Sequence, residues 1–340
     1  MPKAASLGFL APARGSRLRA GAGSVPTRLP RLVIVYVIKR LLQAIPVIFG
    51  VSVLTFVLMI LVPGDPAQKL LGQRASPEAV DELRTRLGLN DPPVQQYLRI
   101  MGNIVRGDLG RSLVTRESVI NEMKNRFPVT LRLAVLAMTF STIIGIAVGI
   151  IAALNQNRFL DRFLMFLTLT GISVPVFWYA LIAILLVVFQ LRWVPQTGIG
   201  DGSLQYYLLP AFVLGTRAAA FIARITRSNM LEVIRQDYIR TAHAKGLSER
   251  AVTYKHAARN ILIPVVTVIG LDLASFIDGA FLTEFVFNIP GLGRYGLTSL
   301  LNRDLPVMIP LVIYTATLYI LANLVVDILY GVIDPRIRYD

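Results

Sequence analysis

The residues of this sequence that could carry chemistry fit no enzymatic or nucleotide-binding pattern. Residues 291–296 read GLGRYG and match G-x-G-x-x-G, which holds a pyrophosphate only where it links a strand to a helix. Here the stretch follows FNIP in an expected loop, so turn-forming glycines are the better interpretation. The chain has no Cys, no Gly-Lys-Ser/Thr phosphate-binding stretch, and only two histidines, His243 and His256. We therefore expect no catalytic residue, no metal site and no cofactor on this chain; if its function consumes energy, a partner must supply it.

A second group of ionisable residues interrupts long apolar segments. Charged groups in lipid are unfavourable, so they normally face a bundle interior or a water-filled path. Two interpretations are open, contact with a transported solute or an intramembrane ion pair that involves the arginine. The group consists of Arg217, Asp272, Asp278 and Asp327. Arg132 and Glu284 lie nearer to the ends of their segments, and we expect their side chains to reach the membrane interface.

The apolar segments predict an all-α polytopic membrane protein. The chain is 54% hydrophobic and 16% charged, whereas soluble domains carry about a quarter charged residues. About six segments are long enough to cross a bilayer. Pro46 lies in the first, Gly145 and Gly149 allow close helix contact in the second, and Gly171 and Pro175 interrupt the third. The segments are 34–62, 129–154, 163–191, 207–225, 261–287 and 307–333.

Basic residues gather in alternate loops and thereby predict the orientation. Residues 1–32 form a basic tail that is rich in Gly, Pro and Ser, a composition typical of disorder, and residues 33–340 form the membrane domain. The loop 224–260 carries eight Lys/Arg and three acids. Because Lys and Arg collect in cytoplasmic loops, this loop and both termini should lie in the cytoplasm.

The loop 63–128 should lie outside and contain a small helical subdomain. Ser76, Pro77 and Glu78 form a good helix start, and Gly88 is placed to end that helix. A second amphipathic run follows between Val94 and Val105. The apolar faces of this external subdomain would hold it against the membrane or against a partner.

The polar stretch QDYIRTAHAKGLSERAVTYKHAARN, residues 236–260, predicts two helices around Gly246. Gly246 can end the first helix in a left-handed conformation, and Ser248 can cap the second, with Leu247 and Val252 at staple positions. Ala242 would let another element pack closely. The alternative is a solvated amphipathic helix on anionic lipid.

The chain resembles the inner-membrane permease subunit of peptide/nickel-type ABC importers. The resemblance covers nearly everything after the tail. The similar blocks are RLLQAIPVIFGVSVLTFVLMILVPGDPA (40–67), GDLGRSL (107–113), SVPVFWYAL (173–181), DYIRTAHAKGLSERAVTYKHAARNILIPVV (237–266), IPGLGRYG (289–296) and NLVVDILYGVIDPRIRY (323–339). The resemblance implies the type I ABC importer permease fold.

In this family a cytoplasmic motif, Glu-Ala-Ala followed three residues later by Gly, forms the coupling helix that docks on the ATPase. Counted back from its glycine, the motif falls here on a stretch in which Arg replaces Glu and Thr replaces the first Ala, and the usual Ile-x-Leu-Pro is absent. The residues that the resemblance assigns to coupling are Arg240, Thr241, Ala242, Gly246, Leu247, Ser248, Glu249 and Val252.

The resemblance also implies partners and a mechanism. The partners are a second homologous permease, which would make a heterodimer, two ATPase subunits and an external substrate-binding protein, with no nucleic acid. The mechanism is alternating access, and di- and oligopeptides are the expected solutes, with nickel or an oligosaccharide as alternatives. An ion-coupled secondary transporter that uses Asp272, Asp278 and Asp327 as relay groups is a different class. An intramembrane enzyme would lack any visible nucleophile, base or metal set.

Overall fold

The computed structural model describes residues 29–61, 64–72, 74–195, 197–258 and 280–333, with the single positions 261, 265, 268, 269, 275 and 276. This part of the chain is built from helices, and Arg111 and Ser118 form an isolated β-bridge. The all-α prediction is therefore confirmed. Of the predicted tail 1–32, residues 1–28 lie outside the described residues, and helix α1 begins at Leu29, before the predicted boundary.

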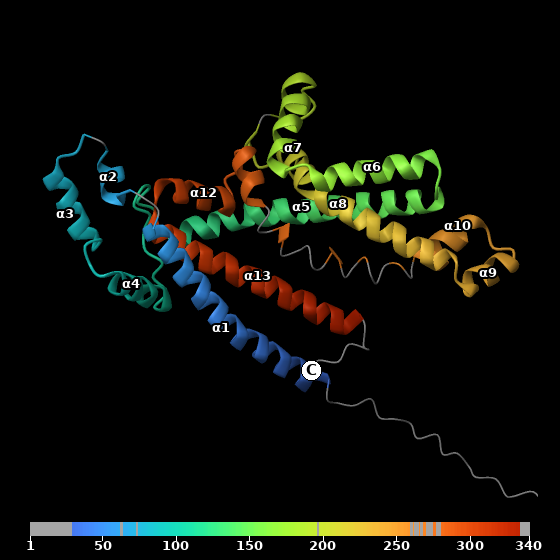
Figure 1. Ribbon diagram of the computed structural model, residues 1–340, viewed down its shortest axis with the longest axis horizontal. Coiled ribbons are helices and arrows are strands. Elements are labelled where there is room, and N and C mark those ends of the chain that lie inside the picture. The colour runs from blue at the N-terminus through green and yellow to red at the C-terminus, as the bar shows by residue number, and fades with distance from the viewer. Residues whose placement is uncertain are drawn as a thin grey trace, which may run out of the picture.

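Four described helices are long and apolar enough to cross a membrane, and a bent pair can supply a fifth crossing. The four helices are α1 (Leu29–Leu61), α5 (Val119–Leu154), α8 (Gln205–Ile234) and α13 (Leu305–Ile333). Each covers a segment predicted from the sequence. The predicted segment 261–287 falls largely outside the described residues. Figure 1 shows α1 beside α13, and α5 running along α8.

The predicted third segment is not one straight helix. It consists of α6 (Phe159–Ser173), α7 (Val176–Ala183) and the π-helical turn η1 (Ile184–Gln190), with a bend of 109° after α6. Pro175 lies at the bend, as its position in the sequence suggests, because proline cannot donate the next helical hydrogen bond. The size of the bend was not predicted.

Glycine residues let α5 and α8 approach closely. A Cβ on Gly145 would lie 2.7 Å from Cβ of Ile222, and a Cβ on Gly149 would lie 2.6 Å from the Ala223 carbonyl oxygen. From the other helix, a Cβ on Gly215 would lie 2.7 Å from the carbonyl oxygen of Ala137. The predicted close contact at Gly145 and Gly149 is confirmed. The two helices therefore touch backbone to backbone and form the central pair of the fold.

Short helices occupy the end of the molecule where α1 ends and α5 begins (Figure 1). They are α2 (Pro66–Leu71), α3 (Pro77–Leu87), α4 (Pro93–Val105) and α12 (Leu292–Asn302). Ser76 caps α3, and Gly88 ends it at φ 66°, as predicted. The expectation that residues 291–296 form a glycine-rich loop is wrong, because α12 begins within that stretch.

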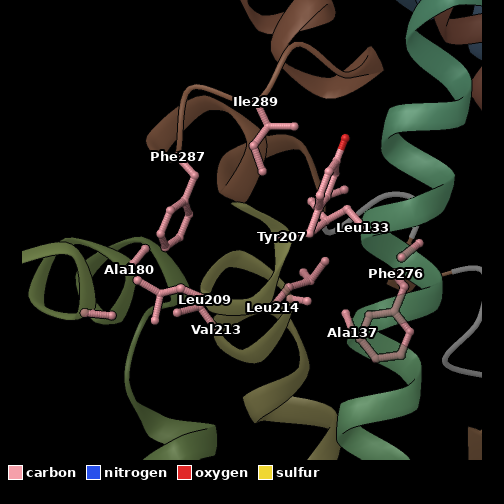
Figure 2. Packing of buried hydrophobic residues seen from close by; sticks show 14 of the residues in the cluster. Leu133, Ala137, Ala180, Tyr207, Leu209, Val213, Leu214, Phe276, Phe287 and Ile289 are labelled. Carbon is pink, nitrogen blue, oxygen red and sulfur yellow. The ribbon is translucent and has the colours of Figure 1, made fainter. Parts of the chain in front are cut away.

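The largest apolar cluster joins α5, α7, α8 and the segment that precedes α12. Figure 2 shows side chains of all four parts in this cluster, among them Leu133, Ala180, Tyr207 and Ile289. A second cluster lies at the other end of α5 and α8, where it supports the segment 237–257.

Candidate coupling site

The segment 237–257 contains a short helix that ends at a glycine. This helix, α9 (Asp237–Ala244), is followed by Gly246 at φ 76°. The backbone N–H of Gly246 donates to the His243 carbonyl at 2.9 Å, and the N–H of Leu247 donates to the Ala242 carbonyl at 3.3 Å. The left-handed conformation is favourable only for glycine, so the predicted helix end is confirmed.

A second helical element starts directly after this turn. It consists of α10 (Glu249–Ala251), which continues as the π-helical turn η2 (Val252–Ala257). The Ser248 hydroxyl accepts a hydrogen bond from the N–H of Ala251 at 3.4 Å, so Ser248 caps the element as predicted. Gly246 and Ser248 together turn the chain back on itself within four residues.

Two of the eight predicted coupling residues lie inside the protein. Ala242 and Val252 are 6% and 3% exposed, and they pack with Ile150 of α5 and Met230 of α8. These two side chains therefore lie on the inner side of the segment. Their apolar side chains pack α9 and η2 against the ends of α5 and α8. Figure 1 shows α9 and α10 at this end of α8.

The other six predicted coupling residues form the exposed side of the segment. They are Arg240, Thr241, Gly246, Leu247, Ser248 and Glu249. The charges beside them are weakly held, because Arg240 lies 3.5 Å from Asp237 and His243 lies 3.5 Å from Glu249, all on largely exposed side chains. Such surface pairs contribute about 0–1 kcal/mol. They can therefore exchange their partners for groups of a docking surface with little loss.

A buried ion pair next to this segment escaped the sequence analysis. Asp161, in the first turn of α6, accepts hydrogen bonds from Nε and one terminal nitrogen of Arg227 on α8, at 2.6 and 2.7 Å. The N–H of Asn157 donates to the same carboxylate. Asp161 lies in a turn with Arg158 and Arg162, which are nearer in sequence, so only the fold identifies Arg227 as its partner.

The structure describes two of the four predicted intramembrane charges, Arg217 and Asp327, and these two do not pair with each other. Arg217 is exposed on α8 and lines an apolar cavity of about 570 Å³ and a neighbouring one of about 530 Å³. Among the described residues, no carboxylate pairs with it. Asp272 and Asp278 lie outside the described residues. Arg217 therefore lies at two cavities, one lined by α5, α6, α7 and α8 and the other by α6, α7 and α8 together with Ser275 and Phe276.

Asp327 of α13 pairs with α1 rather than with Arg217. Its carboxylate accepts hydrogen bonds from the Tyr36 hydroxyl at 2.8 Å and from Arg40 at 2.7 Å, and Arg40 Nε donates to the Tyr36 oxygen at 3.1 Å. Arg40 is 47% exposed at its side chain, so the pair is only partly shielded from its surroundings. This network ties the first described helix to the last.

The expectation that Glu284 reaches the membrane interface is wrong. Its side chain is fully buried, and it accepts hydrogen bonds from the Thr130 hydroxyl of α5 at 2.6 Å and from the N–H of Arg294 at 3.0 Å. Arg294 lies in the first turn of α12, where unpaired N–H groups favour a carboxylate. A Cβ on Gly291 would lie 2.2 Å from the Glu284 carboxylate. Close approach, rather than flexibility, explains that glycine. Arg132, in contrast, remains exposed and donates to the Gly202 carbonyl.

A cavity of about 310 Å³ lies against α12 and includes Arg126, Tyr295 and Asp304 in its wall. The Asp304 carboxylate accepts hydrogen bonds from the Ser112 hydroxyl and from the N–H of Leu113, which fixes the loop before α5. Burial raises the pKa of the Tyr295 phenol, and the nearby Asp304 carboxylate adds to the rise. Arg126 lies 4.7 Å over the Tyr295 ring. These contacts hold α12 firmly against α5.

Two family profiles match the chain over most of its length. Residues 145–339 match the family described as binding-protein-dependent transport system inner membrane component, and residues 33–134 match the N-terminal region of such membrane components. The chain belongs to this family of multi-pass inner-membrane permeases, whose transport depends on a substrate-binding protein.

Individual relatives support the same assignment. The chain is 42% identical to the dipeptide transport system permease protein DppB of Alkalihalophilus pseudofirmus and 44% identical to the di/tripeptide transport system permease protein DppB of Pseudomonas aeruginosa. It is 43% identical to the glutathione transport system permease protein GsiC of Escherichia coli K12. These alignments cover 89% of this chain and 98% or more of each relative.

The fold is also found in a solved transporter. A chain of the inward-facing MetNI methionine ABC transporter superposes with a TM-score of 0.54 at 18% identity, over 63% of this chain and 97% of that one. At this identity the likeness shows the fold alone. It confirms the type I importer permease fold predicted from the sequence.

Proposed function

We propose that the chain is a permease subunit of an ATP-driven importer for di- and oligopeptides. The observation that carries the proposal is the identity of 42–44% to permeases whose names specify dipeptide and di/tripeptide transport. Glutathione, named for a third relative, is itself a tripeptide. Nickel and oligosaccharides are the alternative solutes within the resemblance.

The exposed face of α9 and α10 is the proposed docking surface for an ATPase subunit. It presents Arg240, Leu247 and Glu249 to the surroundings, while Ala242 and Val252 attach it to α5 and α8. A force on this surface would act on the ends of the α5–α8 pair. Because that pair is in backbone contact at Gly145 and Gly149, the two helices would move together.

The opposite end of α5 reaches the proposed outer side of the transporter. There Thr130 donates to Glu284, and the N–H of Leu292 donates to the Thr130 hydroxyl at 2.8 Å. This link attaches α12 to the same helix that carries the docking surface. We infer that α5 passes the motion from the ATPase to α12, which would alternate the access of a path beside Arg217. The path would be completed by a second, homologous permease, giving a heterodimer.

The orientation follows from the charge distribution and is part of the proposal. The basic loop 224–260 and both termini would lie in the cytoplasm, and α2 to α4 and α12 would face the external binding protein. ATP and Mg²⁺ would be bound by two ATPase subunits, and this chain would contribute no catalytic group.

Uptake into vesicles tests the function. The chain is to be reconstituted with the permease, ATPase and binding-protein subunits that copurify with it, and uptake of a labelled dipeptide is to be measured with ATP and no ion gradient. ATP-dependent uptake supports the proposal. Uptake that requires an ion gradient and does not depend on ATP would favour the secondary transporter. If only Ni²⁺ or only an oligosaccharide competed for uptake, that solute would replace peptides in the proposal.

Crosslinking tests the docking surface. Because the chain has no native Cys, Leu247→Cys introduces a single thiol at an exposed position. It should crosslink to an ATPase subunit, whereas Val114→Cys, exposed at the other end of the molecule, should not. If Leu247→Cys formed crosslinks only to the binding protein, the proposed orientation would be wrong, and this segment would lie outside.

A further inference from the structure

Helix α4 carries an exposed apolar stripe that no other part of the described chain covers. The stripe contains Val94, Leu98, Met101 and Val105, and the side chains of Val94, Leu98 and Val105 are 69%, 61% and 82% exposed. At about 100° per residue these four positions fall within an arc of roughly 60°. The residues thus form one continuous line along the helix.

The remainder of α4 is divided between packing and polar groups. Tyr97, beside the stripe, packs on α1 with its ring 5.4 Å from that of Phe56, and its hydroxyl is hydrogen-bonded to Ser52 at 2.8 Å. Gln95 and Asn103 lie on the polar side and are exposed. The helix therefore has one side on α1, one polar side and one uncovered apolar side between them.

The contact with α1 sets the depth of α4 relative to the membrane. Ser52 lies nine residues before Leu61, the last described residue of this spanning helix, which is about 14 Å along the helix axis. Leu54 and Leu58 of the same stretch of α1 are exposed, as expected of a helix surface in lipid. Since Tyr97 reaches Ser52 with its side chain, α4 lies beside a part of α1 that belongs to the candidate membrane span Val35–Leu61.

We propose that α4 is an interfacial helix whose stripe of Val94, Leu98, Met101 and Val105 is inserted among the lipids of the leaflet remote from α9. An amphipathic helix in this position lies with its apolar face buried about 5–10 Å below the headgroups. The stripe is then continuous with the lipid-facing surface of α1. The outer subdomain is anchored to the membrane through α4 as well as through its connections to α1 and α5. This assignment does not depend on the transported solute.

Accessibility of single cysteines to paramagnetic reagents tests the proposal. Leu98→Cys and Val105→Cys place a nitroxide label on the stripe, and Gln95→Cys and Asn103→Cys place it on the polar side of the same helix as matched controls. The chain has no native Cys that would also react. The labelled full chain, assembled with its copurifying subunits, is placed in nanodiscs of phosphatidylethanolamine and phosphatidylglycerol. The accessibility of each nitroxide label to dioxygen, which concentrates in lipid, is then compared with its accessibility to a water-soluble nickel chelate.

Labels on the stripe should show a ratio of dioxygen to nickel accessibility several-fold higher than labels on the polar side. Equal ratios, or higher nickel accessibility on the stripe, would overturn the proposal in favour of a solvent-exposed helix. Exclusion of both reagents from the stripe would show a protein neighbour instead. If that exclusion required the binding protein, this partner would be the occupant. Because all four positions are exposed, each label can be accommodated without repacking the fold.

Discussion

Replacement of Gly149 by alanine should push α5 away from α8 and impair transport. The new Cβ would lie 2.5 Å from Cβ of Thr226 and 2.6 Å from the Ala223 carbonyl oxygen. Carbon atoms pack at about 3.5–4.0 Å, so the helices must separate locally by about 1 Å. Neither neighbour is the end of a flexible side chain that could turn away. Overpacking of this kind reduces stability by about 1–3 kcal/mol.

Gly50→Ala is the matched control for this substitution. Gly50 also lies inside a long helix, α1, but a Cβ there would meet no atom within 4 Å. Both variants gain the better helix propensity of alanine, about 1 kcal/mol, so this gain cancels in the comparison. The two variants should therefore differ by the overpacking energy of about 1–3 kcal/mol, with Gly149→Ala the less stable.

The assay combines unfolding and transport. Thermal unfolding of each purified variant in detergent reports the stability difference, and uptake of dipeptide by reconstituted vesicles reports coupling. Gly149 precedes Ile150, which supports the docking segment, so uptake per inserted molecule should fall in Gly149→Ala and remain normal in Gly50→Ala. Equal stability of the two variants would refute the conclusion that α5 and α8 are in backbone contact at Gly149.

Three further substitutions test other parts of the structure. Gly246→Pro should leave the protein inserted but uncouple transport, because proline cannot adopt φ 76° or donate to His243; ATP-driven uptake at the normal rate would contradict this. Arg227→Ala should destabilise the protein by about 3–5 kcal/mol, because it leaves the buried Asp161 carboxylate without its cation. A change in unfolding free energy below about 1 kcal/mol would show that the pair is not shielded from its surroundings as described. Asp327→Asn, at a partly exposed pair, should cost no more than about 1 kcal/mol, and a larger loss in the same unfolding assay would assign this carboxylate a greater role.

Much of the helical architecture follows from local patterns in the sequence. Apolar runs predict the spanning helices because each must satisfy its own backbone hydrogen bonds within lipid. The caps at Ser76 and Ser248 and the helix ends at Gly88 and Gly246 are also local, since each depends on residues within one turn. Such features need no knowledge of distant parts of the chain.

The partners of the buried polar groups could not be predicted in this way. Glu284 looked like an interfacial residue because the sequence does not place Thr130 and the start of α12 around it. The only local sign of this arrangement was Gly291, which lies within a stretch interpreted as a loop. Its backbone closely approaches the Glu284 carboxylate. Asp161 likewise pairs with Arg227, which is 66 residues away in the chain, rather than with its sequence neighbour Arg162.

For the candidate site, local sequence patterns predict the segment, its turn at Gly246 and its basic character. Which of its side chains face outward depends on the packing of the segment against other helices. Arg240, Leu247 and Glu249 are exposed, while Ala242 and Val252 pack on α5 and α8. The physical reason is that helix formation depends on neighbours in the chain, whereas burial depends on which other helices are present. The docking surface is thus a property of the α5–α8 pair as much as of the motif it carries.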